Sequence, residues 1–254
     1  MLCLIPFYLI FINSFMYESD IIRYGYSFWP GRFSTNAYRA LFRNPGRIIN
    51  AYGITIFVTA AGSFLSLLTV TMTAFVLSRK DFYWRNKISF FFFFTTLFNG
   101  GLVPYYLFLT QVLHINNTIF GLLLPLLFSV WNMIVSMNFF RGLPYEIIES
   151  AKIDGANDFI VYMRLIIPIS TPLLATIGLF TALSYWNDWY NCMLFIGPRH
   201  RHLYTLQYLL QIISRGQQSG SLAETIIATG PMMLAYPFIQ RFFVRGLTIG
   251  SVKG

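Results

Sequence analysis

Charged residues are scarce in this sequence: only 11% of its 254 residues are Asp, Glu, Lys or Arg. A soluble domain carries about 25% charged residues, so this chain has too few charges to cover a globular surface in water. Hydrophobic residues make up 56% of the chain and aromatic residues 19%, which suits a lipid bilayer with aromatic belts at its interfaces. The composition therefore predicts an integral membrane protein.

Ionisable residues are absent from the interiors of the long apolar runs. Proton- and sodium-coupled carriers usually need such a group inside the membrane, so this absence disfavours a secondary transporter. No segment matches the P-loop pattern G-x-x-x-x-G-K-[ST], and we expect no nucleotide or other cofactor on this chain. Cys3 and Cys192 lie far apart, while His200 and His202 flank Arg201. These residues disfavour a metal site.

The formal net charge is +9, which in a soluble protein would indicate nucleic acid as a partner. Here the basic residues are scattered between apolar runs, as expected for loops that face anionic lipid headgroups. We therefore expect contact with membrane lipid and none with nucleic acid.

About six stretches can form transmembrane helices, because a span needs about 20 mostly apolar residues. The first is short and begins almost at Met1, so we expect an upstream extension with a basic segment. In the third, Asn99-Gly100-Gly101 and Pro104 interrupt the helix, and this break either lines a pathway or is a kink packed on a neighbour. We predict an all-α fold in a single transmembrane domain over 1–254, with helices at about 1–17, 48–78, 88–111, 117–140, 160–187 and 223–243.

Basic residues give a weak indication of orientation. If the first helix runs outward, the segments 79–87, 141–164 and 241–254 are cytoplasmic, and all the lysines of the chain fall in them. The positive-inside rule favours this arrangement. It places both termini in the cytoplasm.

The segment 141–164 contains its own helix start and stop signals. Pro144 suits a first helical turn, where its missing N–H would have no partner, and Gly155 can adopt the left-handed conformation that ends a helix. Asn157 or Asp158 can cap the next helix. A short helix over 144–153 would carry an apolar stripe that faces either lipid or a groove on a partner protein, formed by Ile147, Ile148 and Ala151.

The same segment resembles a known family. Glu149-Ser150-Ala151, Gly155 and Ile167-Pro168 match the Glu-Ala-Ala…Gly…Leu-Pro loop of binding-protein-dependent ABC importer permeases, with Ser150 at a position where Ala is usual. Further segments resemble the carbohydrate branch of that family, and most of all its oligosaccharide permeases: Gly100 to Tyr105, Asn138-Phe139-Phe140, Trp186-Asn187-Asp188-Trp189 and the tail 250–254.

The resemblance implies a type I importer bundle in the bacterial cytoplasmic membrane. It implies a second homologous permease, two ATPase subunits that bind ATP and Mg, and an extracytoplasmic sugar-binding protein as partners. This chain would itself be non-catalytic. The implied ATPase contacts are a cytoplasmic coupling helix and the C-terminal tail, namely Glu146, Ile147, Ile148, Glu149, Ser150, Ala151, Asp154, Gly155, Ala156, Ser251, Val252, Lys253 and Gly254.

Aromatic and polar residues gather at the predicted outer end of the fifth helix. Trp186, Asn187, Asp188 and Trp189, with Asn99, are candidates for contact with sugar or with its delivering protein. Aromatic faces stack on the C–H faces of sugars, and amides and carboxylates bind hydroxyls. The alternative is an aromatic belt at the interface. On one continuous helix, Trp186 and Tyr190 would share a face.

The sequence thus predicts the permease subunit of an ATP-driven carbohydrate importer, moving an oligosaccharide inward. The alternatives are a secondary carrier or channel acting alone, and a membrane enzyme or assembly factor. The first alternative requires buried ionisable residues or inverted repeats, and the second a convergent set of catalytic groups. The sequence shows none of these features.

Overall fold

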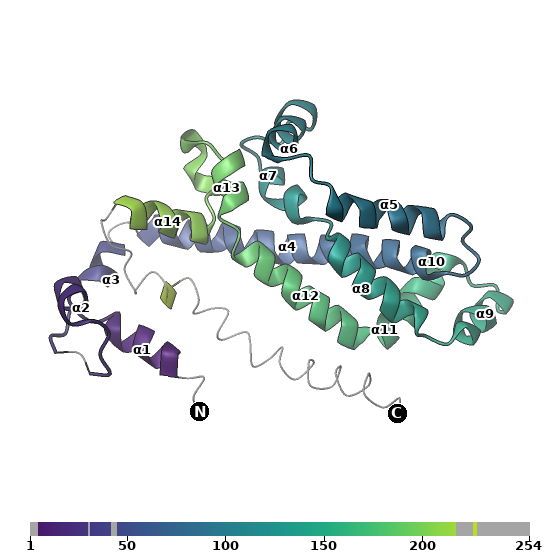
Figure 1. Cartoon of the computed structure of the whole chain (residues 1–254), viewed down its shortest axis with the longest axis horizontal. Coiled ribbons are helices and arrows are strands. Elements are labelled where there is room, and N and C mark those ends of the chain that lie inside the picture. Colours follow the sequence, from purple (N-terminus) through teal and green to yellow (C-terminus); the bar gives the residue numbers. More distant parts are fainter. Residues whose placement is uncertain (1–4, 30, 42–44, 217–225, 228–254) are drawn as a thin grey trace. The chain divides into compact units, whose positions relative to one another are not determined.

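The computed structural model describes residues 5–29, 31–41, 45–216 and 226–227 (Figure 1). It divides into two compact units: unit 1 comprises Met1–Ile56 with Asn187–Phe238, and unit 2 comprises Phe57–Trp186 with Ile239–Gly254. Secondary structure in the described ranges is helical, apart from one isolated bridge between Met16 and Phe33. This agrees with the predicted all-α fold, whereas the single domain over 1–254 stays a prediction.

Helix α4 (Pro45–Ser78) is the one unbroken helix, among the described residues, that is long and apolar enough to cross a membrane. It confirms the predicted helix over 48–78 and extends it at its start. Three bent pairs of helices among the same residues are further candidates, each either a broken span or a re-entrant loop. The described part of the predicted first helix contains α1 (Ile5–Asn13), which ends before Tyr17. The predicted last helix at 223–243 lies outside the described residues except for Ile226 and Ile227.

The predicted helix over 88–111 bends by 116° between α5 (Arg85–Leu97) and the pair α6 (Leu102–Leu107) and π-helix η2 (Phe108–Val112). Gly101 has a φ of +86° at this break, and its N–H donates to Asn99 Oδ1 at 2.8 Å. A residue with a Cβ is strained at such a φ. The Asn-Gly-Gly segment therefore forms a reversal of direction, which is much larger than a simple kink.

The predicted helices over 117–140 and 160–187 are also broken. The first consists of α7 (Phe120–Leu123) with the 3-10 turn η3 (Leu124–Leu126), followed after a bend of 48° by α8 (Val130–Arg141). Ser129 begins α8 by accepting a hydrogen bond from the Asn132 amide. The second comprises α10 (Asp158–Val161), π-helix η4 (Tyr162–Ile166) and α11 (Ile167–Ile169), then α12 (Thr171–Trp186) after a bend of 86°. Proline lacks the N–H that would continue a helix, which accounts for breaks beside Pro125, Pro168 and Pro172.

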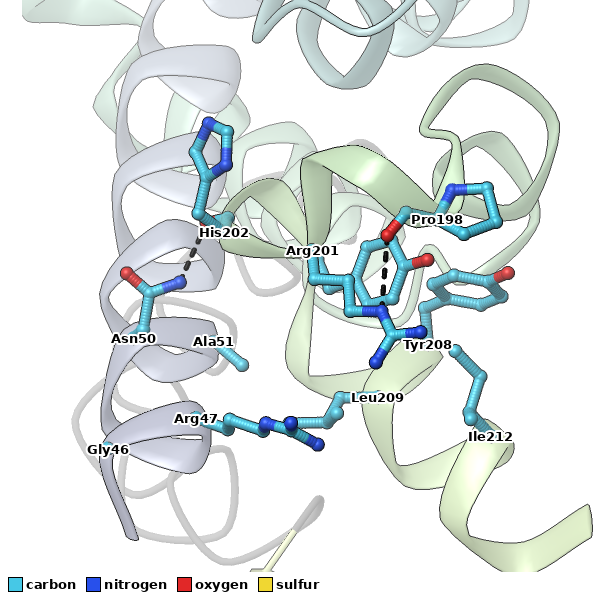
Figure 2. A pocket seen from close by; sticks show the side chains of 11 residues that line it. Gly46, Arg47, Asn50, Ala51, Pro198, Arg201, His202, Tyr208, Leu209 and Ile212 are labelled. Atoms are coloured by element: carbon cyan, nitrogen blue, oxygen red, sulfur yellow. Dashed lines mark hydrogen bonds between the residues drawn. The ribbon is translucent and has the colours of Figure 1, made fainter. Parts of the chain in front are cut away.

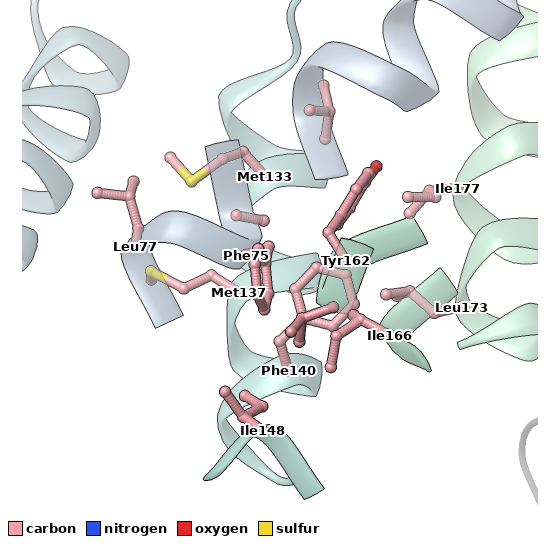
Figure 3. Close-up of a cluster of buried hydrophobic side chains, with 13 residues drawn as sticks. Phe75, Leu77, Met133, Met137, Phe140, Ile148, Tyr162, Ile166, Leu173 and Ile177 are labelled. Carbon is pink, nitrogen blue, oxygen red and sulfur yellow. The ribbon is translucent and has the colours of Figure 1, made fainter. Parts of the chain in front are cut away.

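The core of unit 2 forms where α8, η4 and α12 pack beside the second half of α4 (Figures 1 and 3). The Phe75 ring lies 6.5 Å from Phe140 and 5.6 Å from Tyr162, centroid to centroid. The Tyr162 hydroxyl is 2.6 Å from Thr71 Oγ1, so the polar end of this buried ring is satisfied. Helix α5 packs on this core only through the partly buried Ile88 and Phe92 and contains no buried residue, as expected for a helix whose other faces meet lipid or a partner.

Unit 1 contains helices within regions that the sequence analysis treated as loops. These are α2 (Glu18–Tyr24), α3 (Asn36–Leu41), α13 (Tyr190–Phe195), the 3-10 segment η5 (Pro198–Leu203) and α14 (Leu206–Gly216). Helix α14 is fixed to the first half of α4 by a buried hydrogen bond of 2.8 Å from the Leu206 amide to Thr55 Oγ1. Its apolar spacing, with Leu206 and Leu210 buried, is the sequence pattern that would have predicted it.

Candidate coupling site and permeation surface

The short helix predicted over 144–153 is present as α9 (Tyr145–Ile153), with Pro144 immediately before it, while its coupling role stays a prediction. Gly155 follows with a φ of +82°, the left-handed conformation expected of a helix stop. Asn157 then caps α10, because its Oδ1 accepts a hydrogen bond of 2.8 Å from the Ile160 amide. The start and stop signals in the sequence are therefore confirmed, with Asn157 as the capping residue.

Two of the three residues in the apolar stripe of α9, Ile148 and Ala151, face the core of their own protein. Ile148 is 7% exposed and belongs to the unit 2 core, and Ala151 packs against that core. Ile148 is therefore not part of the surface that α9 offers to a partner, because its side chain is already covered. The exposed face of α9 includes Glu146, Glu149, Ser150 and Ile153, and Asp154 is exposed directly after the helix.

Four charged residues connect α9 to the ends of α4 and α10. Arg79, only 9% exposed, pairs with both Asp81 and Asp158. Lys152 Nζ lies 2.9 Å from Asp81 Oδ2 and 3.9 Å from Asp158 Oδ1. A buried guanidinium requires such partners, since an unpaired buried charge is costly. We call Arg79, Asp81, Lys152 and Asp158 the ion-pair cluster; it joins the two predicted cytoplasmic segments within unit 2.

The cluster shifts the ionisation of its members. The hydrogen bond from Arg79, aided by Lys152, holds the pKa of Asp81 well below its ordinary value, although partial burial opposes this shift. Because Arg79 donates this hydrogen bond to the Asp81 carboxylate, the pKa of Arg79 is raised. Both residues therefore stay charged throughout the physiological pH range.

Unit 2 also contains a pocket that the sequence did not predict. The pocket has a volume of about 450 Å³. One wall is formed by the end of η3 and the start of α8, and the other wall by α12. It combines the aromatic rings of Trp131 and Phe180 with the polar groups of Ser129, Asn132 and Thr181. Asn132 Nδ2 donates to Thr181 Oγ1 at 3.2 Å. The described residues that line this pocket are all uncharged. The sequence signal was weak, since isolated polar residues within apolar runs also occur in helix packing.

The predicted aromatic and polar cluster is divided by the fold. Helix α12 ends at Trp186, which is buried, and α13 begins at Tyr190. The expectation that Trp186 and Tyr190 share a face of one helix is therefore wrong. The break follows from Asp188, whose Oδ1 accepts from the Asn191 amide at 3.1 Å and so starts a new helix.

The remaining candidates have local partners. Burial raises the pKa of Asp188, while hydrogen bonds from Asn191 oppose the rise. Asn187 Oδ1 lies 3.3 Å from Gln207 Nε2, and the Trp189 ring makes an edge contact with Tyr190. Asn99 is exposed at the break after α5. The tail residues Ser251, Val252, Lys253 and Gly254 lie outside the described residues.

Comparisons with known proteins place this architecture in a class. No family model matches the sequence. The solved structure of a bacterial ABC transporter involved in the import of the acidic polysaccharide alginate matches with a TM-score of 0.79 and 26% identity, over 95% of this chain and 91% of the other. The fold is thus that of an ABC importer permease.

Curated relatives narrow the class. The permease protein of the polygalacturonan/rhamnogalacturonan transport system of Bacillus subtilis (strain 168) is 34% identical over 272 residues, covering 100% of this chain and 94% of the relative. The arabinooligosaccharides permease of the same organism is 26% identical over 274 residues, covering 100% and 92%. The chain belongs to the permease subunits of carbohydrate ABC importers. It is an integral protein of the inner membrane and a non-catalytic translocation subunit.

Proposed function

We propose that this chain moves an oligosaccharide inward as half of a permease pair. Its partners are a second homologous permease, an extracytoplasmic sugar-binding protein, and two ATPase subunits that bind ATP and Mg and hydrolyse the ATP. Both termini lie in the cytoplasm. The relatives named for polygalacturonan/rhamnogalacturonan and arabinooligosaccharide transport support a substrate of several sugar units.

The observation that carries the proposal is the uncharged pocket between α8 and α12. Irregular backbone at membrane depth is tolerated where it lines a cavity or is covered by protein, and the bend before α8 lies at this pocket. Trp131 is 71% exposed there and can stack on a sugar ring, while Asn132 and Ser129 can bind hydroxyls. A carrier coupled to protons or sodium would instead use an ionisable group at this depth.

Coupling to the ATPase is assigned to the exposed face of α9. Glu146, Glu149 and Asp154 make that face acidic, and Ile153 is 82% exposed beside them. The buried Ile148 and the ion-pair cluster hold the helix on unit 2, so a displacement of α9 by an ATPase reaches the core that contains α8 and α12.

The test is ATP-dependent uptake by the complete importer in proteoliposomes, with a panel of di- to tetrasaccharides and saturating binding protein. Asn132→Leu removes the amide but keeps a similar volume. We expect uptake to fall by about tenfold, because the sugar hydroxyl that binds the Asn132 amide loses its hydrogen-bond partner. Asn138→Leu makes the same change at an exposed position of α8 outside the pocket and should leave uptake unchanged. Equal uptake by the two variants would contradict the assignment of this pocket.

A further inference from the structure

A second pocket, of about 540 Å³, lies in unit 1 between the start of α4 and the segment η5 to α14 (Figure 2). Arg47 extends into it from α4 and Arg201 from η5, so two guanidinium groups from distant parts of the sequence line one pocket. None of the described residues that line it carries a carboxylate. The proposed permeation surface lies elsewhere, in unit 2.

The two arginines have no ion pair within the part of the chain that the structure describes. Arg201 Nε donates to the Pro198 carbonyl at 3.1 Å, which orients the guanidinium. Two carboxylates of unit 1 whose side chains the structure describes have other partners, because Asp20 pairs with Arg32 and Asp188 accepts from Asn191. Two like charges facing one cavity repel each other, and an anion between them removes that repulsion.

The walls of the pocket are held by contacts within unit 1. Asn50 Nδ2 donates to the His202 carbonyl at 2.7 Å, which fixes η5 to α4. The buried Tyr204 ring meets Tyr208 edge to face, with 4.9 Å between centroids. The volume lies within the range of about 300–1,000 Å³ found for small-ligand sites. These contacts fix the backbone on both sides of the pocket.

We propose that this pocket binds a carboxylate-bearing sugar unit, and thus that the imported carbohydrate is acidic. This inference rests on the proposed function and names its substrate class. A guanidinium binds a carboxylate through two parallel hydrogen bonds. Tyr208, which is half-buried in the pocket wall, offers aromatic surface to the C–H face of the same ring, and Asn50 offers an amide to its hydroxyls. A neutral sugar would offer no negative charge to either guanidinium.

A lipid phosphate or an acidic patch of the sugar-binding protein would also attract two arginines. A phosphate alone makes no use of the Tyr208 ring, and the volume of about 540 Å³ is that of a small-ligand site. The observations therefore favour the acidic sugar, and the experiment distinguishes the other two sources.

The test uses the complete importer in liposomes of phosphatidylcholine alone, which removes anionic lipid. The probes are trigalacturonate and a neutral galactose trisaccharide of the same linkage. We expect Arg47→Gln and Arg201→Gln each to lower kcat/KM for trigalacturonate about tenfold, the usual effect of losing one charged hydrogen bond, with neutral uptake unchanged. Arg199→Gln makes the same change on the same 3-10 segment but outside the pocket, so it is the control and should match wild type.

Three results would overturn the inference. Loss of uptake for both sugars, with weaker binding-protein affinity, would make the pocket a docking surface. Variant effects that occur only when anionic lipid is added would make it a lipid site. If kcat/KM for trigalacturonate in both variants equals that of Arg199→Gln, the pocket has no role in binding the acidic sugar. If a variant fails to assemble, Arg47→Lys and Arg201→Lys keep the charge and are measured instead.

Failure of the proposed function would look different. Wild-type importer that takes up neither trisaccharide would contradict oligosaccharide import for these sugars. Calorimetric titration of the purified complex with trigalacturonate then tests separately whether the pocket binds an acidic sugar. Binding that is lost in Arg47→Gln but kept in Arg199→Gln supports the site, and no binding to wild type overturns it.

Discussion

Two glycines of unit 2 are required for different physical reasons. At Gly62, on α4, an added Cβ would lie 2.6 Å from Tyr185 Cε1 and 2.7 Å from Cε2. The Tyr185 ring is fully buried, and its hydroxyl donates to the Leu123 carbonyl at 2.7 Å, so it has little freedom to move. Gly155 has open space around it but a φ of +82°. The first glycine permits close packing, and the second permits a backbone conformation.

Gly62→Ala is expected to destabilise the protein by about 1–3 kcal/mol, the usual cost of overpacking a core. The measurement is the thermal melting temperature of the purified protein in detergent. Gly53→Ala is the matched control, since Gly53 lies on the same helix and an added Cβ there meets nothing within 4 Å. Alanine favours helix over glycine by about 1 kcal/mol, so this control should melt at or above the wild-type temperature. A lower melting temperature for both variants would contradict the packing argument.

Gly155→Val should weaken the association of the ATPase subunits, because a left-handed residue with a Cβ is strained by about 1–2 kcal/mol. Gly155→Asn should be milder, since Asn tolerates this conformation. The measurement is the amount of ATPase that co-purifies with membrane-inserted permease. Equal retention of ATPase by Gly155→Val and wild type would argue against α9 as the coupling helix.

At the scale of elements, the ion-pair cluster fixes α9 to the ends of α4 and α10. Asp81→Asn removes one of the two partners of Arg79 and the nearer partner of Lys152. Asp81 is 40% exposed, so solvent screening limits the expected loss of stability to about 1 kcal/mol. Hydrogen exchange of the α9 amides should become faster. Asp154→Asn, at an exposed position beside the same helix, should leave that exchange as in wild type.

The loss of thermal stability caused by Asp81→Asn should not depend on pH between 6 and 8. The pKa of Asp81 lies below its ordinary value in the folded protein, so its contribution is complete above the unfolded pKa of about 3.9 and is lost as the pH falls through the folded value. The melting-temperature difference between wild type and Asp81→Asn is therefore expected to be constant across this range. A difference that shrinks between pH 8 and pH 6 would assign the interaction to another titrating group.

Local signals predicted the features that depend on neighbouring residues. Helix α4 follows from an uninterrupted apolar run, and the end of α9 from a glycine at the right distance from Pro144. The sequence also located the break at Asn99-Gly100-Gly101, but not its angle of 116°. The angle depends on the φ of Gly101 and on what the following helix packs against, and neither is encoded in hydropathy.

Long-range features were not predictable from one sequence. Lys152 and Asp81 are 71 residues apart, and many pairs of opposite charge at such separations never meet. The apolar stripe on α9 predicted that one face of this helix is buried. Periodicity does not show which surface covers that face, and the structure shows that Ile148 and Ala151 pack on the core of unit 2. Both pockets combine residues from separate helices, so their composition became visible only in the folded chain.

At the scale of the whole molecule, the ion-pair cluster constrains topology. The segments 79–87 and 141–164 are both predicted to be cytoplasmic, and the contact of Lys152 with Asp81 requires that they lie on the same side of the membrane. The segment after α13, with Arg199, is predicted to be external. The positive-inside rule chooses between the two possible orientations but only weakly.

Cysteine labelling in intact cells tests this orientation. In a Cys3→Ser background, Cys192 can remain, because burial raises the pKa of its thiol to about 11 and thiol reagents react with the thiolate. We expect Arg199→Cys to react with an impermeant maleimide. Lys80→Cys and Asp154→Cys, both exposed positions, should react only with a permeant reagent or after permeabilisation. External labelling of both would reverse the orientation, and external labelling of one alone would contradict the ion-pair contact that joins the two segments.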